Sequence, residues 1–94
     1  MVRSELIQKL AAERPDLQLE TMEAVVDAVF DAITDTLARG GRVEIRGFGA
    51  FVAKTRQART GRNPRTGDAV AITEKRVPTF RAGKGILARL NEKL

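Results

Sequence analysis

Apolar residues recur every three to four positions in two stretches near the N-terminus, a spacing typical of helices with one buried face. The first helix is predicted over Arg3–Arg14, where Ser4 can cap its start and Pro15 stops it. The second is predicted over Glu20–Arg39. It ends at Gly40-Gly41, because glycine readily adopts the left-handed conformation that closes a helix.

The apolar stripe of the second predicted helix is too long for the short first helix to cover. It consists of Met22, Val25, Val26, Val29, Phe30, Ile33 and Leu37. Ordinary core packing would give the same stripe, but a domain of 94 residues is marginal alone. A partner subunit is therefore the expected cover, and residues 1–40 are the expected dimerisation part of a single domain, 1–94.

Beyond residue 41 the apolar period shortens to two, which predicts strands. Val43 and Ile45 mark the buried face of a first strand, and residues 47–51 turn the chain into a second. A third strand is predicted over Arg76–Arg81, where Pro78 implies a sheet edge or a bulge. A short helix from about Gly83 to Leu94 completes an α+β fold with a three-stranded antiparallel sheet.

Residues 55–75 lie between the second and third strands, and their first half has no large apolar side chain. Compact domains rarely contain a connection of this length without structure. Val70 and Ile72 alternate with small or polar residues, as in a strand. The segment is therefore expected to form a protruding two-stranded ribbon, the arm, with its tip near Arg62–Arg65 and a reach of roughly 30 Å.

Charge is divided unevenly along the chain. The net charge is +5, but the first forty residues are acidic overall and the remainder is strongly basic. This division favours a scaffold joined to a surface that binds a polyanion, although a solvated basic face without a partner would look the same. The basic residues of the arm and its root are Arg56, Arg59, Arg62, Arg65, Lys54, Lys75 and Arg76.

The absence of cysteine and histidine narrows the chemistry further. It removes disulfides, thiolate metal sites and the commonest general base. The acidic residues mostly follow one helix face, which favours a solvated surface over a catalytic pair. We therefore expect a non-enzymatic protein without metal or cofactor. No apolar run reaches membrane-spanning length and no signal-peptide core is present, so a cytoplasmic location is expected.

Pro64 stands among arginines at the expected tip of the arm, and two roles fit it. It can fix a turn, which is the more frequent use of proline. It can also act as a compact apolar wedge that enters between base pairs and kinks a duplex. Composition alone leaves both roles open.

Three segments resemble the hallmark motifs of one protein family. They are Arg46-Gly47-Phe48-Gly49-Ala50-Phe51, Arg59-Thr60-Gly61-Arg62-Asn63-Pro64-Arg65-Thr66-Gly67 and Val77-Pro78-Thr79-Phe80. On these segments the chain is similar to the HU and integration host factor family of bacterial DNA-bending proteins. The similarity covers essentially the whole chain, including the order of its elements.

The resemblance implies an intertwined dimer whose two arms embrace double-stranded DNA, in the nucleoid, with roles in recombination and transcription control. It implies that Pro64 is the wedge and that Lys84 contacts a phosphate from the start of the last helix. The full set of expected DNA-binding residues is Pro64, Arg62, Arg65, Arg59, Asn63, Arg56, Arg46, Glu44, Lys54, Lys75, Arg76 and Lys84.

Within this family, Val43-Glu44-Ile45-Arg46 resembles the β subunit of integration host factor. The resemblance implies that Arg46 reaches DNA beside a preferred site, that Glu44 helps to orient it, and that the partner is an α-like subunit. A non-specific HU-like homodimer stays open, as does a basic module that binds an acidic protein. Gly85 departs from the family pattern, and since glycine costs about 1 kcal/mol inside a helix, the last helix is expected to start late or fray.

Overall fold

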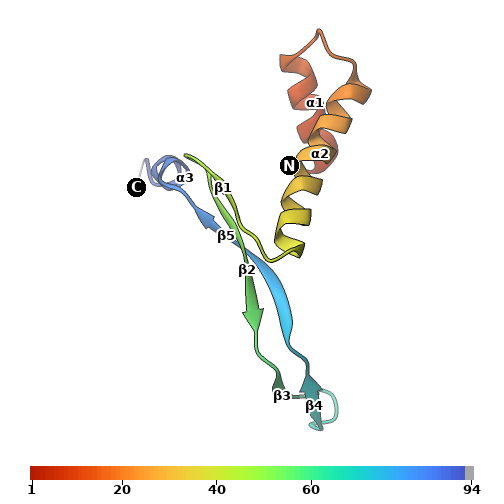
Figure 1. Ribbon diagram of the computed structural model, residues 1–94, viewed down its shortest axis with the longest axis vertical. Coiled ribbons are helices and arrows are strands. Elements are labelled where there is room, and N and C mark those ends of the chain that lie inside the picture. The colour runs from red at the N-terminus through yellow and green to blue at the C-terminus, as the bar shows by residue number, and fades with distance from the viewer. Residues whose placement is uncertain (93–94) are drawn as a thin grey trace. The chain divides into compact units, whose positions relative to one another are not determined.

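The computed structural model describes residues 1–92, so Leu94 itself lies outside the described residues. Within them the last helix already ends at Leu90, where the Asn91 side chain donates to the Leu87 carbonyl at 2.8 Å, so the predicted continuation of this helix toward Leu94 was wrong. The elements follow one another as predicted for an α+β chain, with two helices, a sheet, a ribbon and a short last helix (Figure 1). They fall into two compact units, Met1–Asp35 and a second unit from Thr36 onward. No helix within residues 1–92 combines the length and the hydropathy that a membrane span requires.

Helix α1 (Arg3–Glu13) begins one residue before the predicted cap. Val2 occupies the N-cap position in an extended conformation, and no side chain caps the helix, so the prediction for Ser4 was wrong. The physical reason is that Arg3 is already helical, so Ser4 lies within the first turn and not at the N-cap position. Arg3 also pairs with two acidic residues of α2 (Leu19–Ala38). Its guanidinium donates to Asp27 Oδ1 and Oδ2 at 2.9 and 2.7 Å and to Glu23 Oε1 at 3.1 Å.

Exposed ion pairs of the first unit shift the pKa of Arg3, of Arg14 and of Asp16. Hydrogen bonds to Asp27 and then to Glu23 raise the pKa of Arg3 above its ordinary value. The hydrogen bonds that Arg14 donates to Asp16 lower the pKa of that carboxyl. All three ion pairs are solvent-exposed and contribute little to folding.

The core of the first unit is small. Among the described residues, only Ile7, Met22 and Val26 are buried hydrophobics, with Leu6, Leu10, Ala11 and Leu17 packed around them. Val25, Val29 and Phe30 lie on the predicted apolar stripe of α2 but remain about half exposed. Within one chain the stripe is therefore covered at Met22 and Val26 and open at Val25, Val29 and Phe30, as expected for a subunit that needs a partner.

The last turn of α2 closes in a Schellman motif. The Gly40 N–H donates to the Leu37 carbonyl at 3.0 Å, and the Gly41 N–H donates to the Thr36 carbonyl at 2.9 Å. Gly40 has a φ of 84°, a left-handed conformation that favours glycine. The predicted end of this helix at the two glycines is confirmed.

The sheet of the second unit has the strand order β1-β2-β5, all antiparallel. Its strands are β1 (Val43–Ile45), β2 (Gly49–Arg56) and β5 (Lys75–Ala82). Pro78 lies opposite Ala53 on β5, which is an edge strand, so the predicted edge position of this proline is confirmed.

An aromatic cluster anchors one face of the sheet. The Phe80 ring lies 4.9 Å from the Phe51 ring across the β2–β5 pair and 5.3 Å from the Phe48 ring in the β1–β2 turn. Phe48 and Phe80 are nevertheless 45 % and 40 % exposed, and Ile45 on the same face is also exposed. The predicted apolar face exists, but like part of the stripe on α2 it is not fully covered within this chain.

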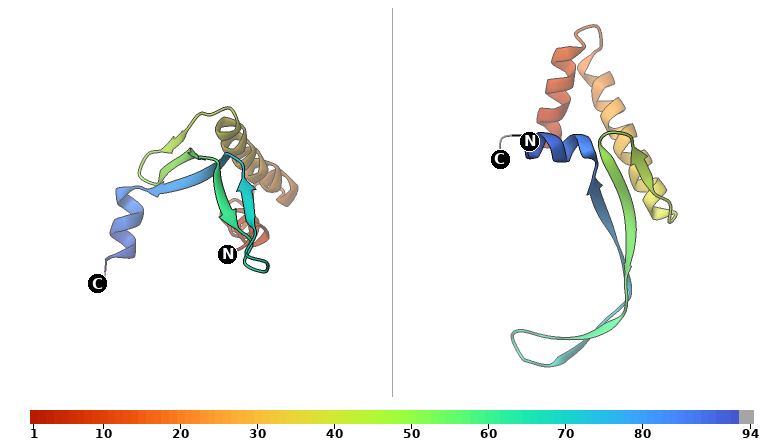
Figure 2. Two further views of the ribbon diagram at one scale, coloured as in Figure 1. Left: turned by 90° about the horizontal axis from the view of Figure 1, so that it is seen from below. Right: turned by 90° about the vertical axis from the view of Figure 1, so that its left-hand side faces the viewer.

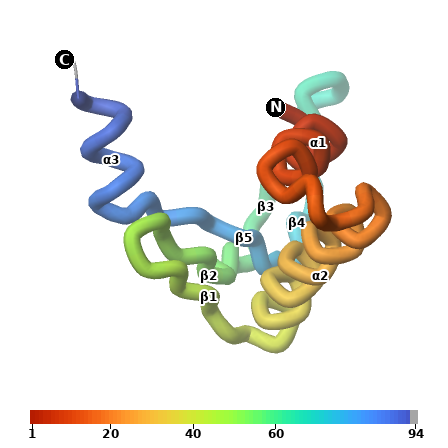
Figure 3. Tube along the Cα trace, turned by 90° about the horizontal axis from the view of Figure 1, so that it is seen from above, coloured from red at the N-terminus to blue at the C-terminus, as the bar shows by residue number. Residues whose placement is uncertain are grey.

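Helix α3 (Lys84–Leu90) begins directly after β5, beside the β1–β2 turn (Figure 3). The Gly83 N–H donates to the Phe48 carbonyl at 2.8 Å. The expectation of a late start at Gly85 was wrong for a steric reason. A Cβ at Gly85 would lie 2.5 Å from the Gly47 carbonyl oxygen, so glycine permits the helix to approach the turn from its first residues.

The arm continues β2 and β5 as the two-stranded sheet of β3 (Arg59–Arg62) and β4 (Ala69–Ile72). The strand ladder is interrupted at residues 57–58 and 73–74, and the ribbon curves between the sheet and its tip (Figure 2). The same pairing register holds on both sides of the gap, since Arg56 pairs with Lys75 and Arg59 with Ile72. Equal numbers of residues on the two strands therefore span the interruption.

Candidate nucleic-acid interface

The tip of the arm is a loop over residues 63–68, closed by its own polar groups. The Asn63 N–H donates to the Asp68 carbonyl at 2.8 Å, and the Gly67 N–H donates to the Asn63 carbonyl at 2.7 Å. The Asn63 side chain accepts the Arg65 N–H at 2.8 Å. These bonds wrap around Pro64, which is exposed beside them. Asn63 thus shapes the loop that presents Pro64.

The arginines of the arm project from both of its faces. Successive residues of a strand point to opposite sides, and paired residues share a side. Arg59 therefore shares a face with its partner Ile72, whereas Arg62 shares the other face with its partner Ala69. The three-residue spacing of the arginines produces this alternation. A ribbon with cations on both faces suits a groove whose two walls are both lined by phosphates.

A hollow of about 380 Å³ lies at the interruption of the ladder. Residues from both faces of the arm line it, including the cations Arg56, Arg59 and Lys75. Three positive side chains around one concave surface repel one another unless an anion lies between them. The curve of the ribbon thus brings these three cations around one hollow, whereas a straight ribbon would place them on two opposite faces.

The sheet carries a basic face opposite the aromatic cluster. Because Ala50 pairs with both Glu44 and Arg81, these three residues share one face across the three strands. Alternation along β2 and β5 places the following cations on that face: Lys54, Arg56, Lys75 and Arg81. The basic face therefore carries Arg81 near the β1–β2 turn and the other three cations at the root of the arm, with Val52 and Thr79 between them.

Arg76 does not belong to this face. It pairs with Thr55 and has the same parity along β5 as Phe80, so it lies on the aromatic side of the sheet. Its guanidinium Nη2 donates to the Leu37 carbonyl at 3.1 Å. The grouping of Arg76 with Lys54 and Lys75 as one basic root is thus not what the structure shows.

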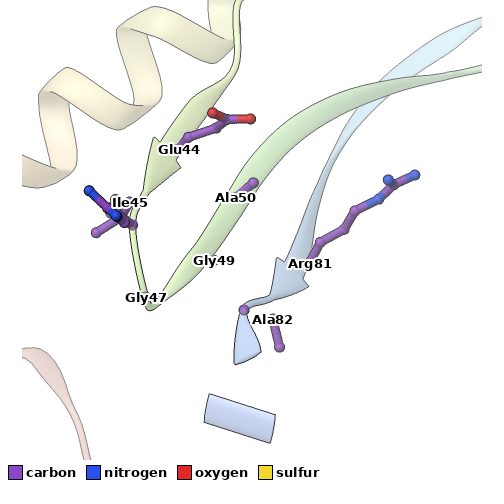
Figure 4. A pocket seen from close by; sticks show the side chains of 9 residues that line it. Glu44, Ile45, Gly47, Gly49, Ala50, Arg81 and Ala82 are labelled. Carbon is purple, nitrogen blue, oxygen red and sulfur yellow. The ribbon is translucent and has the colours of Figure 1, made fainter. Parts of the chain in front are cut away.

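A shallow groove of about 520 Å³ lies between the β1–β2 turn and the end of β5 (Figure 4). Glu44 and Arg46 line it from one side, and Arg81 lines it from the other. Glu44 forms an ion pair with Arg42, which precedes β1. In this structure the glutamate is thus paired with Arg42, and the role toward Arg46 that the resemblance implies for it stays a prediction.

Two arginines that contribute to this surface, Arg81 and Arg42, were absent from the sequence-based set. The signal for Arg81 was available, because its odd number matches Lys75 along a strand with period two. What the sequence did not give was the pairing of that strand with Lys54 and Arg56. Lys84, which was predicted, is exposed at the start of α3.

The described residues offer little beyond this basic surface. Within residues 1–92 no three acidic side chains gather closely enough to hold a metal ion. No buried polar side-chain atom in that range lacks a hydrogen-bond partner. Positive charge is concentrated on the arm and on the basic face of the sheet.

This fold and surface define a small α+β protein that presents a basic two-stranded arm. Residues 1–91 match the family model of bacterial DNA-binding proteins. The chain therefore belongs to this family, the HU family of DNA-binding architectural proteins. The family is not one of enzymes, in agreement with the sequence-based expectation.

Solved structures agree with this assignment. The HU chain of an HU–DNA cocrystal from Anabaena is 34 % identical, with a TM-score of 0.86 over 96 % of this chain and 97 % of that one. A mutant of transcription factor 1 is 30 % identical, with a TM-score of 0.63 over 100 % and 93 %. HU from Thermotoga maritima, at 24 % identity and a TM-score of 0.65 over 96 % and 98 %, shows the same fold. The predicted α+β architecture is confirmed.

Proposed function

We propose that this chain is one subunit of a dimer that binds double-stranded DNA, places its arms in the minor groove and bends the duplex. One observation carries the proposal: Pro64 is exposed on a loop tied by hydrogen bonds, at the end of a ribbon with arginines on both faces. A proline there is a rigid apolar body without an N–H, surrounded by cations that bind phosphates. The Anabaena relative is known from a cocrystal with DNA, which supports the same class of ligand.

The energetics of such a complex follow from two opposing terms. Bending a site of 20–30 base pairs costs on the order of 1–6 kcal/mol by elastic estimates. Phosphate contacts from the basic face of the sheet and from the arms offset that term, because each contact releases condensed counterions. Sequence preference then comes mainly from how easily a site deforms, and Arg46, exposed at the β1–β2 turn, adds local contacts.

Dimerisation is part of the proposal because two apolar surfaces are open in the single chain. They are the stripe on α2 with Val25, Val29 and Phe30, and the aromatic face with Phe48 and Phe80. Exposed apolar surface of this extent is characteristic of subunit interfaces. In a bacterial cell the dimer would act in the nucleoid, in DNA compaction, recombination and transcription control.

The nature of the partner divides two versions of the function. As an integration host factor β-like subunit, the chain would pair with an α-like chain and prefer certain sites. As an HU-like protein it would form a homodimer and bind without sequence preference. The motif Val43-Glu44-Ile45-Arg46 favours the integration host factor β-like subunit. The 34 % identity to an HU chain fits the HU-like homodimer equally well.

The native mass of the protein tests this division. Expressed alone, an HU-like chain is expected at twice the subunit mass of 10.3 kDa, and it should protect random DNA evenly in footprinting. An integration host factor-like chain is expected to exchange into a heterodimer when an α-like chain is co-expressed, with protection confined to particular sites. A folded, stable monomer under native conditions would contradict dimerisation in either version.

Replacement of Pro64 by alanine is expected to reduce the bend. Wedges in the minor groove produce kinks of about 20–90°, a range known for benders that include HU and integration host factor, and alanine is too small to hold a base step open. The measurement is energy transfer between dyes at the two ends of a short duplex. Thr60→Ala, on β3 of the same arm, is the matched control, because it removes a small exposed side chain outside the tip loop, and it should leave the angle unchanged. If Pro64→Ala gives the wild-type angle, Pro64 only fixes the turn.

A further inference from the structure

Arg76 lies at the root of the arm but is turned away from the basic face. On β5 its neighbour Lys75 pairs with Arg56 and contributes to the basic face, whereas Arg76 pairs with Thr55 on the side of the aromatic cluster. Side chains on opposite faces of a sheet cannot both lie against one DNA surface without a twist of the strand. Its location thus separates Arg76 from the other basic residues of the root.

The guanidinium of Arg76 is engaged by the end of α2. Nη2 donates to the Leu37 carbonyl at 3.1 Å, and the same carbonyl also accepts the Gly40 N–H of the Schellman motif. The last turn of α2 contains no basic residue of its own. Arg76 supplies, from 39 positions along the chain, the positive charge that the negative end of a helix favours.

The glycine at position 40 belongs to the same arrangement. A Cβ on Gly40 would lie 3.4 Å from Arg76 Nη2, in van der Waals contact with the guanidinium. Gly40 therefore has two roles: its positive φ closes the helix, and its lack of a side chain leaves room for the Arg76 guanidinium. The helix end and the arm root are joined at this point within the second compact unit.

We infer that Arg76 is a positioning residue that anchors the root of the arm to the closing turn of α2, and that it does not contact DNA. The inference rests on the proposed function. A two-stranded ribbon is only marginally stable by itself, so the direction of the arm depends on how its root is held. Over roughly 35 Å of strand from root to tip, a rotation of about 10° at the root would displace the tip by about 6 Å.

Arg76→Gln tests the anchor against Arg56→Gln, a matched loss of one positive charge on the basic face. In the free protein, Arg76→Gln is expected to accelerate amide hydrogen exchange at Gly40 and Gly41 roughly two- to fivefold, as fits one exposed charge-assisted hydrogen bond. In the DNA complex it should reduce the bend while the slope of log affinity against log salt stays at the wild-type value. Arg56→Gln should lower that slope by about 0.9 for each lost phosphate contact and leave the exchange unchanged.

The outcomes distinguish Arg76 as an anchor of the arm from Arg76 as a residue that contacts DNA. If Arg76→Gln lowers the salt slope as Arg56→Gln does, and the exchange at Gly40 stays at the wild-type rate, Arg76 contacts DNA and the anchor is wrong. If the wild-type protein fails to bind or bend DNA, the proposed function is wrong, yet the exchange measurement still tests the contact with Leu37. Should Arg76→Gln fail to fold, Arg76→Lys undergoes the same measurements, because it keeps a charge and a donor but loses the planar fork.

Discussion

Raising the monovalent salt concentration from about 50 to 200 mM is expected to weaken the binding of this protein to duplex DNA by about a thousandfold. A loss of this size corresponds to six or more phosphate contacts in the complex. One chain already offers six suitable cations on its arm and basic face, namely Lys54, Arg56, Arg59, Arg62, Lys75 and Arg81. A dimer presents twice that number, so the thousandfold loss requires only half of them to contact phosphates.

The measurement is a titration of a fluorescent duplex at several salt concentrations, with the slope of log affinity against log salt as the readout. Pro64→Ala is the control, because it removes the proposed wedge but leaves every cation in place. It should therefore keep the wild-type slope. Arg59→Gln combined with Arg62→Gln should reduce the slope by about 1.8 for each arm. A nearly flat dependence for the wild type would contradict a mechanism led by phosphate contacts.

Prediction from the sequence succeeded where a pattern is local. The change of apolar period at residue 41 located the sheet, and the lack of large apolar side chains after residue 55 located the arm. Gly40 ended α2 as its conformational freedom predicts. Each of these features depends on residues within a few positions of one another.

The errors concern contacts between distant residues. Ser4 lies inside α1 and does not cap it, because the helix already begins at Arg3, which pairs with Asp27 on the next helix. Gly85 fits inside α3 because the Gly47 carbonyl lies against it, a proximity that helix propensity does not include. Arg76 was grouped with Lys75 by adjacency, whereas the pairing of β2 with β5 assigns them to opposite faces. Register across strands depends on the whole sheet, so composition of a single segment cannot give it.

Gly49→Ala is expected to destabilise the protein by about 3 kcal/mol or more and to lower its melting temperature by about 10 °C or more. A Cβ at this position would lie 2.5 Å from the Arg81 carbonyl oxygen and 2.6 Å from Phe80 Cζ. Neither atom can retreat easily. The carbonyl belongs to the β2–β5 pair, and the ring is held between those of Phe48 and Phe51.

Gly61→Ala is the matched control, because it also adds a methyl group to a glycine in a strand. The Cβ there would lie 2.7 Å from Cδ1 of Ile72, the far end of a flexible side chain that can turn aside. Thermal unfolding followed by circular dichroism should therefore show a large loss for Gly49→Ala and a small one for Gly61→Ala. Equal melting temperatures for the two variants would mean that the turn and β5 do not pack as closely as the structure has them. In that case the groove between Arg46 and Arg81 would also differ from the one described, since Gly49 is one of the residues that line it.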